Sequence, residues 1–135
     1  EEMLFFIHRN YFWWDKNGNR EPYISRLNLK KDRLTNISSI NHEGYFELEL
    51  DNISELGINY NINKDGYILV QIDNNSNFIF DNFESLKHNQ DQENNDSLYK
   101  ILKWKINDNN KSYSCKEKSL IQVKMKNSNI YCIYY

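Results

Sequence analysis

Apolar and polar residues alternate along several short stretches of the chain, and this alternation is its clearest pattern. In residues 45–50, Phe46, Leu48 and Leu50 fall on one side of an extended backbone, and a tyrosine and two glutamates fall on the other. Residues 67–72 and 120–126 alternate in a similar way. A period of two residues is typical of a β-strand with one face in the core. Each stretch is therefore predicted to be a half-buried strand.

Residues that favour tight turns stand between these stretches. Asp-Gly and Asn-Gly pairs supply the positive φ angles that a two-residue hairpin turn requires. Two such pairs and one Asn-Ser-Asn segment predict three hairpin connections and so an antiparallel sheet. They are Asn17-Gly18 between residues 11–14 and 23–29, Asp65-Gly66 between 58–62 and 67–72, and residues 127–129 between 120–125 and 130–135.

We therefore predict an all-β fold, a single antiparallel β-sandwich or barrel-like domain over residues 1–135 with about eight to ten short strands. At most one or two short helical turns are expected, at residues 51–56 and 98–102. Leu102, Trp104 and Ile106 alternate with lysines, however, and fit a strand equally well. Residues 87–97 contain no apolar side chain, which predicts a polar mobile loop within the domain.

The composition supports the strand prediction. The chain contains 22 asparagines and 13 lysines but no alanine, so the best helix former is missing. Tyrosine leads the aromatic residues with 10, and aromatic side chains favour strands. This usage resembles that of proteins from malaria parasites, whose genomes are very AT-rich, and some clostridia, ciliates and large DNA viruses share it. The resemblance implies an origin and no particular function.

Charge and hydropathy narrow the class of partner. The formal net charge is -2, and lysines alternate with apolar residues, so no basic field marks a nucleic-acid partner. No window approaches the roughly 18 apolar residues that a membrane-spanning helix requires, so no membrane span is expected in this chain. A protein partner is the class that we expect.

The two cysteines, Cys115 and Cys132, lie close together in the sequence. On neighbouring strands they are within reach of a disulfide, and the alternative is a pair of buried free thiols. Neither stands at a helix start or in a glycine-rich turn, so no lowered thiol pKa is expected.

Features of the chain as a whole favour a secreted or cell-surface protein. Asn-x-Ser sequons occur at positions 36, 52, 74, 95 and 110. The first residue is not Met, so we expect a processed product or an excised domain. An intracellular assembly is the alternative location.

A possible calcium loop is the most specific motif. Oxygen-bearing side chains fall at positions 1, 3, 5, 9 and 12 of a stretch that begins at residue 73, which resembles the loop of the EF-hand family. The family has glycine at position 6, where this chain has Phe78, so we favour a polar hairpin loop followed by a strand. The resemblance implies a calcium ion on Asp73, Asn75, Asn77, Asp81 and Glu84.

Aromatic side chains gather at the two ends of the chain. Residues 11–14 are Tyr, Phe, Trp and Trp, so a strand there carries rings on both faces, and residues 130–135 have the same character. One face of each strand is predicted to fill the core. The other is predicted to bind a partner, because Tyr and Trp offer large contact areas with few rotatable bonds. The candidate binding residues are Tyr11, Trp13, Trp14, Tyr131, Tyr134 and Tyr135.

Part of the first aromatic segment resembles a known repeat. Residues 12–15 (Phe-Trp-Trp-Asp) and 24–29 are similar to the aromatic-Asp strand and the return strand of one blade of a YWTD-type β-propeller. Because a closed propeller needs at least about four blades, the resemblance implies that this chain supplies only part of one.

No catalytic residue and no cofactor is predicted. His8, His42 and His88 form no metal-ligand pair, and nucleophile elbows, phosphate loops and dinucleotide fingerprints are missing from the sequence. We therefore expect a non-catalytic protein-binding module of a secreted or surface protein that engages partners through an aromatic patch or a sheet edge. The alternatives are a structural subunit or fragment of a larger assembly, including a partial β-propeller, and third a calcium-dependent or enzymatic domain.

Overall fold

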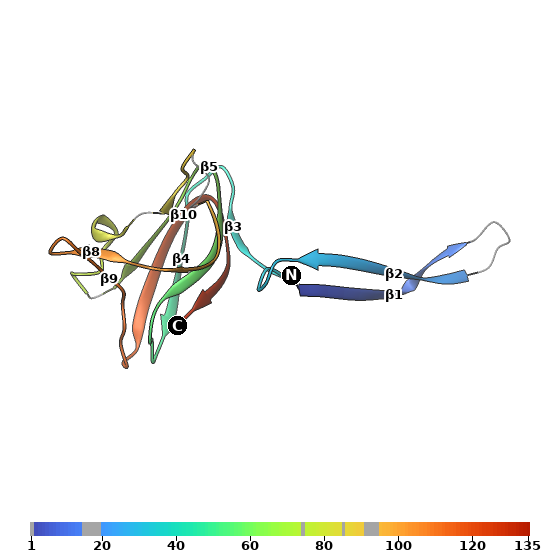
Figure 1. Ribbon diagram of the computed structural model, residues 1–135, viewed down its shortest axis with the longest axis horizontal. Coiled ribbons are helices and arrows are strands. Elements are labelled where there is room, and N and C mark those ends of the chain that lie inside the picture. The colour runs from blue at the N-terminus through green and yellow to red at the C-terminus, as the bar shows by residue number, and fades with distance from the viewer. Residues whose placement is uncertain (1, 15–19, 74, 85, 91–94) are drawn as a thin grey trace. The chain divides into compact units, whose positions relative to one another are not determined.

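The computed structural model describes residues 2–14, 20–73, 75–84, 86–90 and 95–135, and up to residue 29 it describes the backbone alone. These residues form β-strands, one 3-10 turn and no α-helix, and every strand pair is antiparallel (Figure 1). The all-β prediction is confirmed. The expected domain consists of two compact units, Glu1–Leu34 and Thr35–Tyr135, called unit 1 and unit 2.

Unit 1 is a hairpin of β1 (Glu2–Trp14) and β2 (Arg20–Leu29). The two strands pair along their length apart from a bulge between His8 and Phe12. This pairing confirms the hairpin predicted from residues 11–14 and 23–29. The predicted turn at Asn17-Gly18 lies outside the described residues.

Unit 2 is built around two long strands, β5 (Gly57–Ile72) and β10 (Ser119–Tyr134), which pair with each other. On its second side β10 pairs with both β3 (Ile37–Ser39) and β4 (Gly44–Leu50). On its second side β5 pairs with β6 (Leu86–Lys87) and β7 (Asp96–Ile101). The 3-10 turn η1 (Phe80–Asn82) and a hairpin of β8 (Trp104–Ile106) and β9 (Asn109–Lys111) complete the unit.

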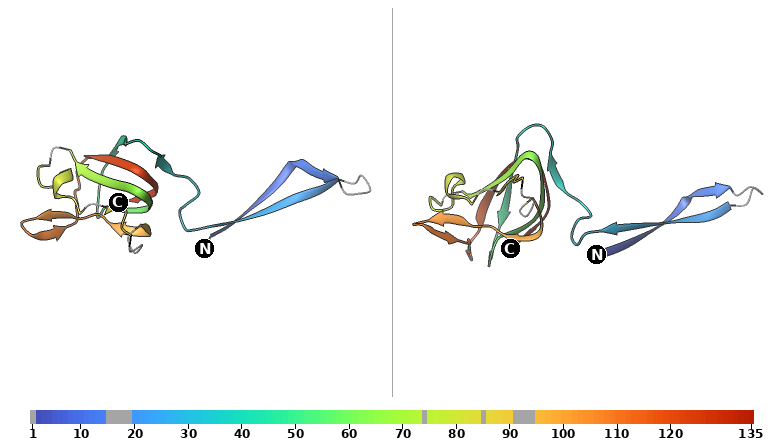
Figure 2. Two further views of the ribbon diagram at one scale, coloured as in Figure 1. Left: turned by 90° about the horizontal axis from the view of Figure 1, so that it is seen from above. Right: turned by 45° about the horizontal axis from the view of Figure 1, so that its top comes forward.

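The strand pairing of this six-stranded sheet is interrupted along one line that crosses the whole sheet. Residues 63–66 of β5 stand opposite the single residue Asn127 of β10. The gap between β3 and β4, at residues 40–43, and the gap between β6 and β7, at residues 88–95, flank the same place. Both long strands curve strongly in Figure 2. We call this interruption the fold line of the sheet.

Gly66 and Asn127 allow the strands to meet at the fold line. A Cβ atom on Gly66 would lie 2.5 Å from the carbonyl oxygen of Asn127 and 2.7 Å from that of Asn63, so this approach requires glycine. Asn127 has a φ of 44°, a left-handed conformation that asparagine tolerates. Its side-chain amide donates to the Lys64 carbonyl (3.3 Å) and its oxygen accepts from the Asn41 amide (2.7 Å). One side chain thus ties three segments together.

The hairpin turns predicted at Asp65-Gly66 and at residues 127–129 are wrong, because β5 and β10 continue through both places. The residue types that favour hairpin turns also favour one kind of bulge within a strand, because both require positive φ angles. Asp65, with a φ of 60°, has such a backbone inside β5. The extra residue at 127 also shifts the inward positions of β10. These have odd numbers up to Met125, followed by Ser128 and Ile130, and a second register shift between Ile130 and Cys132 lets Ile133 pack against the core.

One hydrophobic core fills the inside of the folded sheet. Inward residues from both sides of the fold line, such as Tyr60 and Val70, belong to it. Trp104 is fully buried, and its indole N–H donates to the Val70 carbonyl (3.1 Å). The rings of Phe78 and Phe83 pack against it with centroids 5.3 and 5.2 Å away. The alternating stretches lie in β4, β5 and β10 with their predicted apolar faces toward this core.

The short C-terminal elements correct further expectations. No helix forms at the described residues 51–56 or 98–102, and β7 covers most of the second stretch. The hairpin of β8 and β9 was not predicted, although its turn residues Asn107 and Asp108, with φ of 49° and 62°, suit a type I′ turn. The predicted polar loop at 87–97 begins in β6 and ends in β7, and its residues 91–94 lie outside the described residues.

Replacing Gly66 by alanine is expected to lower the free energy of unfolding by about 2–3 kcal/mol. The three atoms nearest to the new Cβ are backbone carbonyl oxygens, two of β10 and one of β5, and they move only if the backbone shifts at the fold line. Gly44→Ala is the matched control, because its nearest neighbour is the Ser39 Cβ at 3.3 Å, and its loss should stay below about 1 kcal/mol. Urea unfolding followed by fluorescence measures both, and equal losses would contradict the special role of Gly66.

Candidate functional site

The predicted aromatic binding residues fall into two groups in the structure. Each group lies in a different unit, and only the second has described side chains, so the site is built from that group. Tyr11, Trp13 and Trp14 lie in β1 of unit 1, whereas Tyr131 and Tyr134 lie in β10 of unit 2 and Tyr135 follows them.

Aromatic rings meet on the surface at the C-terminal end of β10. Tyr99 of β7 and Tyr134 of β10 form an edge-to-face pair, with ring centroids 5.1 Å apart and planes at 65°. Tyr99 is 51% exposed, and the sequence neighbours Leu98 and Tyr135 are 44% and 58% exposed. We call Leu98, Tyr99, Tyr134 and Tyr135 the aromatic patch. Exposed apolar side chains gathered in this way mark interaction sites.

A glycine in β5 makes room for the aromatic patch. Gly57 pairs with Ile101 of β7 on one side and with Tyr134 of β10 on the other. A Cβ atom on Gly57 would lie 2.8 Å from the ring of Tyr99, so this ring lies directly over the bare backbone of β5. Tyr99 therefore reaches Tyr134 across an intervening strand.

The polar tips of both rings are held in place. The Tyr99 hydroxyl donates to a carboxylate oxygen of Glu55 (2.9 Å), and the Tyr134 hydroxyl donates to the Leu98 carbonyl (3.3 Å). The bond to Glu55 raises the pKa of Tyr99, and desolvation adds to this shift. The phenol therefore stays protonated and keeps donating at neutral pH. The orientation of each ring is therefore fixed by its hydroxyl bond and by its contact with the other ring.

Sequence reasoning found only part of this patch. Tyr134 and Tyr135 were predicted, but Leu98 and Tyr99 were assigned to a possible helical turn. Tyr131 lies elsewhere, beside a separate hollow of about 290 Å³ that Thr35, Asn36 and Ile37 also line. The available signal was Gly57 between apolar strand residues, because an isolated glycine in a strand marks a close approach by another group.

The two cysteines are free thiols, which was one of the two alternatives considered. Cys115 pairs with Ile53 in an isolated bridge, in which its amide donates to the Ile53 carbonyl (2.9 Å). Cys132 lies in β10 opposite Asn59 of β5. Both thiols are partly exposed rather than buried.

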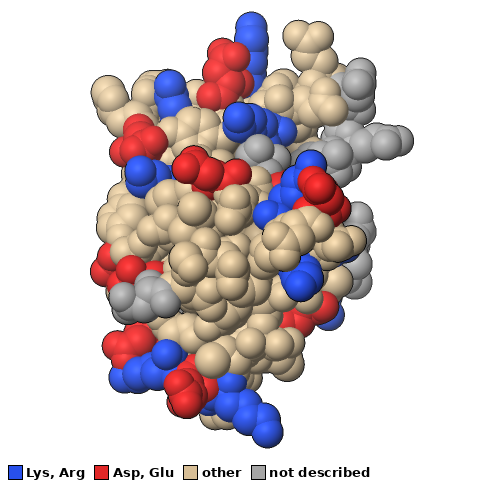
Figure 3. Space-filling model, turned by 90° about the vertical axis from the view of Figure 1, so that its left-hand side faces the viewer, with Lys and Arg blue, Asp and Glu red and all other residues tan. Residues whose placement is uncertain are grey.

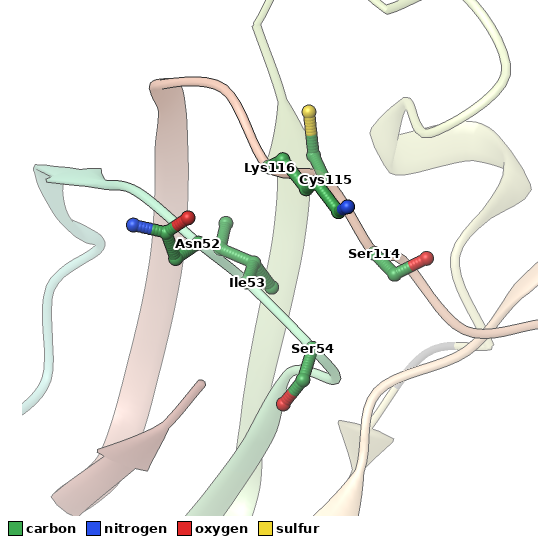
Figure 4. A pocket seen from close by; sticks show the side chains of 6 residues that line it. All are labelled: Asn52, Ile53, Ser54, Ser114, Cys115 and Lys116. Atoms are coloured by element: carbon green, nitrogen blue, oxygen red, sulfur yellow. The ribbon is translucent and has the colours of Figure 1, made fainter.

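Cys115 borders an open hollow of about 680 Å³ between residues 52–54 and 114–116. The two segments run beside each other in Figure 4, and their polar side chains project in different directions. Groups that act together on a substrate must converge on one point. The polar side chains here do not converge in this way; they belong to Asn52, Ser54, Ser114 and Cys115.

Hydrogen bonds nevertheless lower the pKa of the Cys115 thiol. A hydrogen bond from the Glu117 backbone does most to lower the pKa of Cys115, and a bond from the Tyr113 hydroxyl adds to this effect. Tyr113 is itself held by Ser119, with 2.8 Å between the two hydroxyl oxygens. The expectation that neither cysteine has a lowered pKa is therefore wrong for Cys115. A tight loop of hydrogen-bond donors has the same effect here as a helix start.

The calcium candidates lie around the loop after β5. Asn75 accepts from the backbone amide of Asn77 (3.2 Å), as in an Asx turn. Asp81 belongs to η1, so a 3-10 turn occupies the place of the expected strand after Phe78. In the described part of the chain, no group of three or more His, Cys, Asp or Glu side chains could hold a metal ion. Calcium binding by Asp73, Asn75, Asn77, Asp81 and Glu84 stays a prediction.

Charged residues of both signs are mixed over the surface. On the face that Figure 3 shows, Lys and Arg lie among Asp and Glu around a largely uncharged centre. This face therefore carries no large patch of a single sign. Among the described residues we find no helix with the length and apolar character that crossing a membrane requires.

Comparisons with known proteins identify no relative of this chain. No family model, no curated protein and no solved structure matches the chain.

Alkylation of Cys115 is expected to begin at a lower pH than alkylation of an ordinary thiol. In a Cys132→Ser variant, the rate of reaction with iodoacetamide should rise with a midpoint below that of the same chain unfolded in urea, because the thiolate is the reacting form. Tyr113→Phe removes one donor and should move the midpoint upward. A folded midpoint equal to the unfolded one would contradict the lowered pKa of this thiol.

Proposed function

We propose that this chain is a non-catalytic protein-binding module of a secreted or cell-surface protein, and that the aromatic patch meets its partner. The observation that carries this proposal is the ring pair of Tyr99, which is exposed, and Tyr134, which is half-buried. Tyrosine is among the residues most enriched where binding energy concentrates in protein interfaces. The sequons at Asn36, Asn52 and Asn110 lie on exposed residues, which accords with the proposed location.

The fixed geometry of the patch favours binding over a purely structural role. A flexible side chain loses about 0.5–1.5 kcal/mol of conformational freedom when a partner immobilises it. The rings of Tyr99 and Tyr134 are already held by Glu55 and by the Leu98 carbonyl, so most of this loss is avoided. The core also does not require them, since Trp104 and its neighbours fill the inside of the folded sheet.

Binding through the patch is tested by substitution at Tyr99. A photo-crosslinking amino acid in place of Tyr135 identifies the partner in extracellular fluid of the source cells, and the affinity is then measured with purified proteins. Tyr99→Ser is expected to weaken this affinity about 30-fold, the effect of losing roughly 2 kcal/mol at an interface hot spot. Circular dichroism checks that the variant remains folded.

Tyr67→Ser is the matched control for this test. Tyr67 lies in β5 and donates to a glutamate, Glu43, as Tyr99 donates to Glu55, but no ring packs against it in the described structure. Its replacement should change the affinity less than twofold. Similar losses from both substitutions, or none from Tyr99→Ser, would exclude the patch as the binding surface.

A structural subunit of a larger assembly is the second candidate, and unit 1 favours it. β1 and β2 pair only with each other among the described residues, and a lone two-stranded hairpin is marginally stable in water. Residues 3–7 and 11–14 make this hairpin rich in apolar residues. A covering surface from a neighbouring chain would stabilise it.

Sedimentation velocity separates this candidate from the first. If unit 1 mediates assembly, the full chain sediments as an oligomer, and the double substitution Trp13→Ser with Trp14→Ser returns it to a monomer. Tyr99→Ser should leave the oligomer unchanged. A monomeric full chain in which acrylamide quenches the fluorescence of both hairpin tryptophans would contradict assembly, and Trp104 adds little to that signal because it is fully buried.

A further inference from the structure

β4 forms one edge of the sheet in unit 2. All seven of its residues pair with β10, from Gly44 opposite Met125 to Leu50 opposite Ser119, in a register without a bulge. Among the described residues of unit 2, no strand pairs with its other side. The backbone groups that point to that side offer a regular template for one more strand.

The hydrophobic core is less well covered at this edge. Phe46, Leu48 and Leu50 pack against the core and are only half-buried. Their neighbours toward the centre of the sheet are closed off, since Ile121 opposite Leu48 and Val123 opposite Phe46 are each 1% exposed. Apolar side chains on an added strand would complete this layer.

The outward face of β4 is acidic. Glu47 accepts hydrogen bonds from Tyr45 and from the Gln122 amide (2.8 Å to Gln122), and Glu49 forms an ion pair with Lys118. On the β10 side, these carboxylates therefore contact the amide of Gln122 and the ammonium group of Lys118, the residue before β10. A strand on the other side would meet the same carboxylates, and basic side chains complement them.

We propose that β4 binds an extended segment of another protein as an added antiparallel strand, and that this segment alternates apolar and basic residues. Its apolar side chains lie beside Phe46, Leu48 and Leu50, and its Lys or Arg side chains lie beside Glu47 and Glu49. Main-chain hydrogen bonds supply affinity, and the alternating side chains supply specificity. This edge is separate from the aromatic patch, so the proposal holds or fails independently of the proposed function.

A second copy joined through β4 is a poorer occupant. Antiparallel pairing of two β4 strands with their apolar faces on one side would bring the glutamates of one copy opposite those of the other. Like charges directly opposite each other destabilise a strand pair. The acidic face thus selects a basic strand and opposes self-pairing.

The proposal is tested with a designed peptide and the full chain. The probe is acetyl-Lys-Val-Lys-Ile-Lys-Val-Lys-amide, and its counterpart carries Glu in place of each Lys. Amide NMR shifts on titration should concentrate in β4, and the Glu peptide should bind at least tenfold more weakly. Shifts centred elsewhere, or equal binding of both peptides, would overturn the proposal.

Two N-methylated versions of the probe test strand addition itself. In an antiparallel pair, only alternate amides of a strand point toward its neighbour. Methylation of one alternate set should abolish binding, whereas methylation of the other set should change the affinity less than threefold. Equal effects would mean that the peptide is held by charge alone, and this would contradict strand addition.

Charge reversal on the protein completes the test. Glu47→Lys with Glu49→Lys should weaken binding of the basic probe about tenfold or more, while the matched double substitution Asp81→Lys with Glu84→Lys should have little effect. Asp81 and Glu84 are exposed outside β4. Circular dichroism confirms that both variants fold. Equal losses, or β4 shifts that appear when the concentration of the chain alone is raised, would overturn the proposal in favour of general attraction or self-association.

Discussion

The close approach of β5 to β10 at Gly66 and Asn127 is the constraint on which the rest of unit 2 depends. Both strands are 16 residues long, and a sheet of that length cannot enclose a core unless it bends. Four unpaired residues on β5 and one on β10 supply the bend, and the bare Cα of Gly66 lets the two backbones remain in contact through it. The core residues on the two sides of the fold line then belong to one hydrophobic core.

The same bend separates the two candidate binding surfaces. One half of the sheet contains β4 with residues 119–125 and 67–72, and the other contains β3 and β7 with residues 128–134 and 57–62. The β4 edge therefore belongs to the first half and the aromatic patch to the second. A partner at one surface leaves the other half of the sheet open to a different partner.

Local patterns identified the strands but not their connections. The alternation at Phe46, Leu48 and Leu50 specifies a strand and the face that it buries, because both follow from backbone geometry alone. The residues at Asp65-Gly66 specify only a backbone conformation, which serves equally in a hairpin turn and in a bulge within a long strand. The choice between them depends on residues 127–129, some sixty positions away, where β10 bends to match. No pattern within either segment contains that information.

The candidate site was predictable to a similar degree. Residues 130–135 were correctly predicted to form a strand with aromatic residues on its surface, because the composition and the residue period are enough for that prediction. The partner ring of Tyr99 comes from β7, and its position depends on the absence of a side chain at Gly57 in the strand between them. The lowered pKa of Cys115 was missed for the same reason, since its donors Glu117 and Tyr113 are brought to the thiol by the path of the loop.

The hydrogen bonds of the surface tyrosines show why only one group of them forms a patch. Tyr45, Tyr67 and Tyr99 each donate to a glutamate, and in each case this bond raises the tyrosine pKa, to about 12 for Tyr45. Each phenol is therefore neutral below pH 10, and the contribution of its bond to stability is lost only as the pH rises through the raised value. Fixing the hydroxyl orients a ring but does not by itself create a contact surface. Tyr99 differs from Tyr45 and Tyr67 because it also lies over Gly57 and packs against Tyr134, so that two oriented rings present one continuous apolar surface.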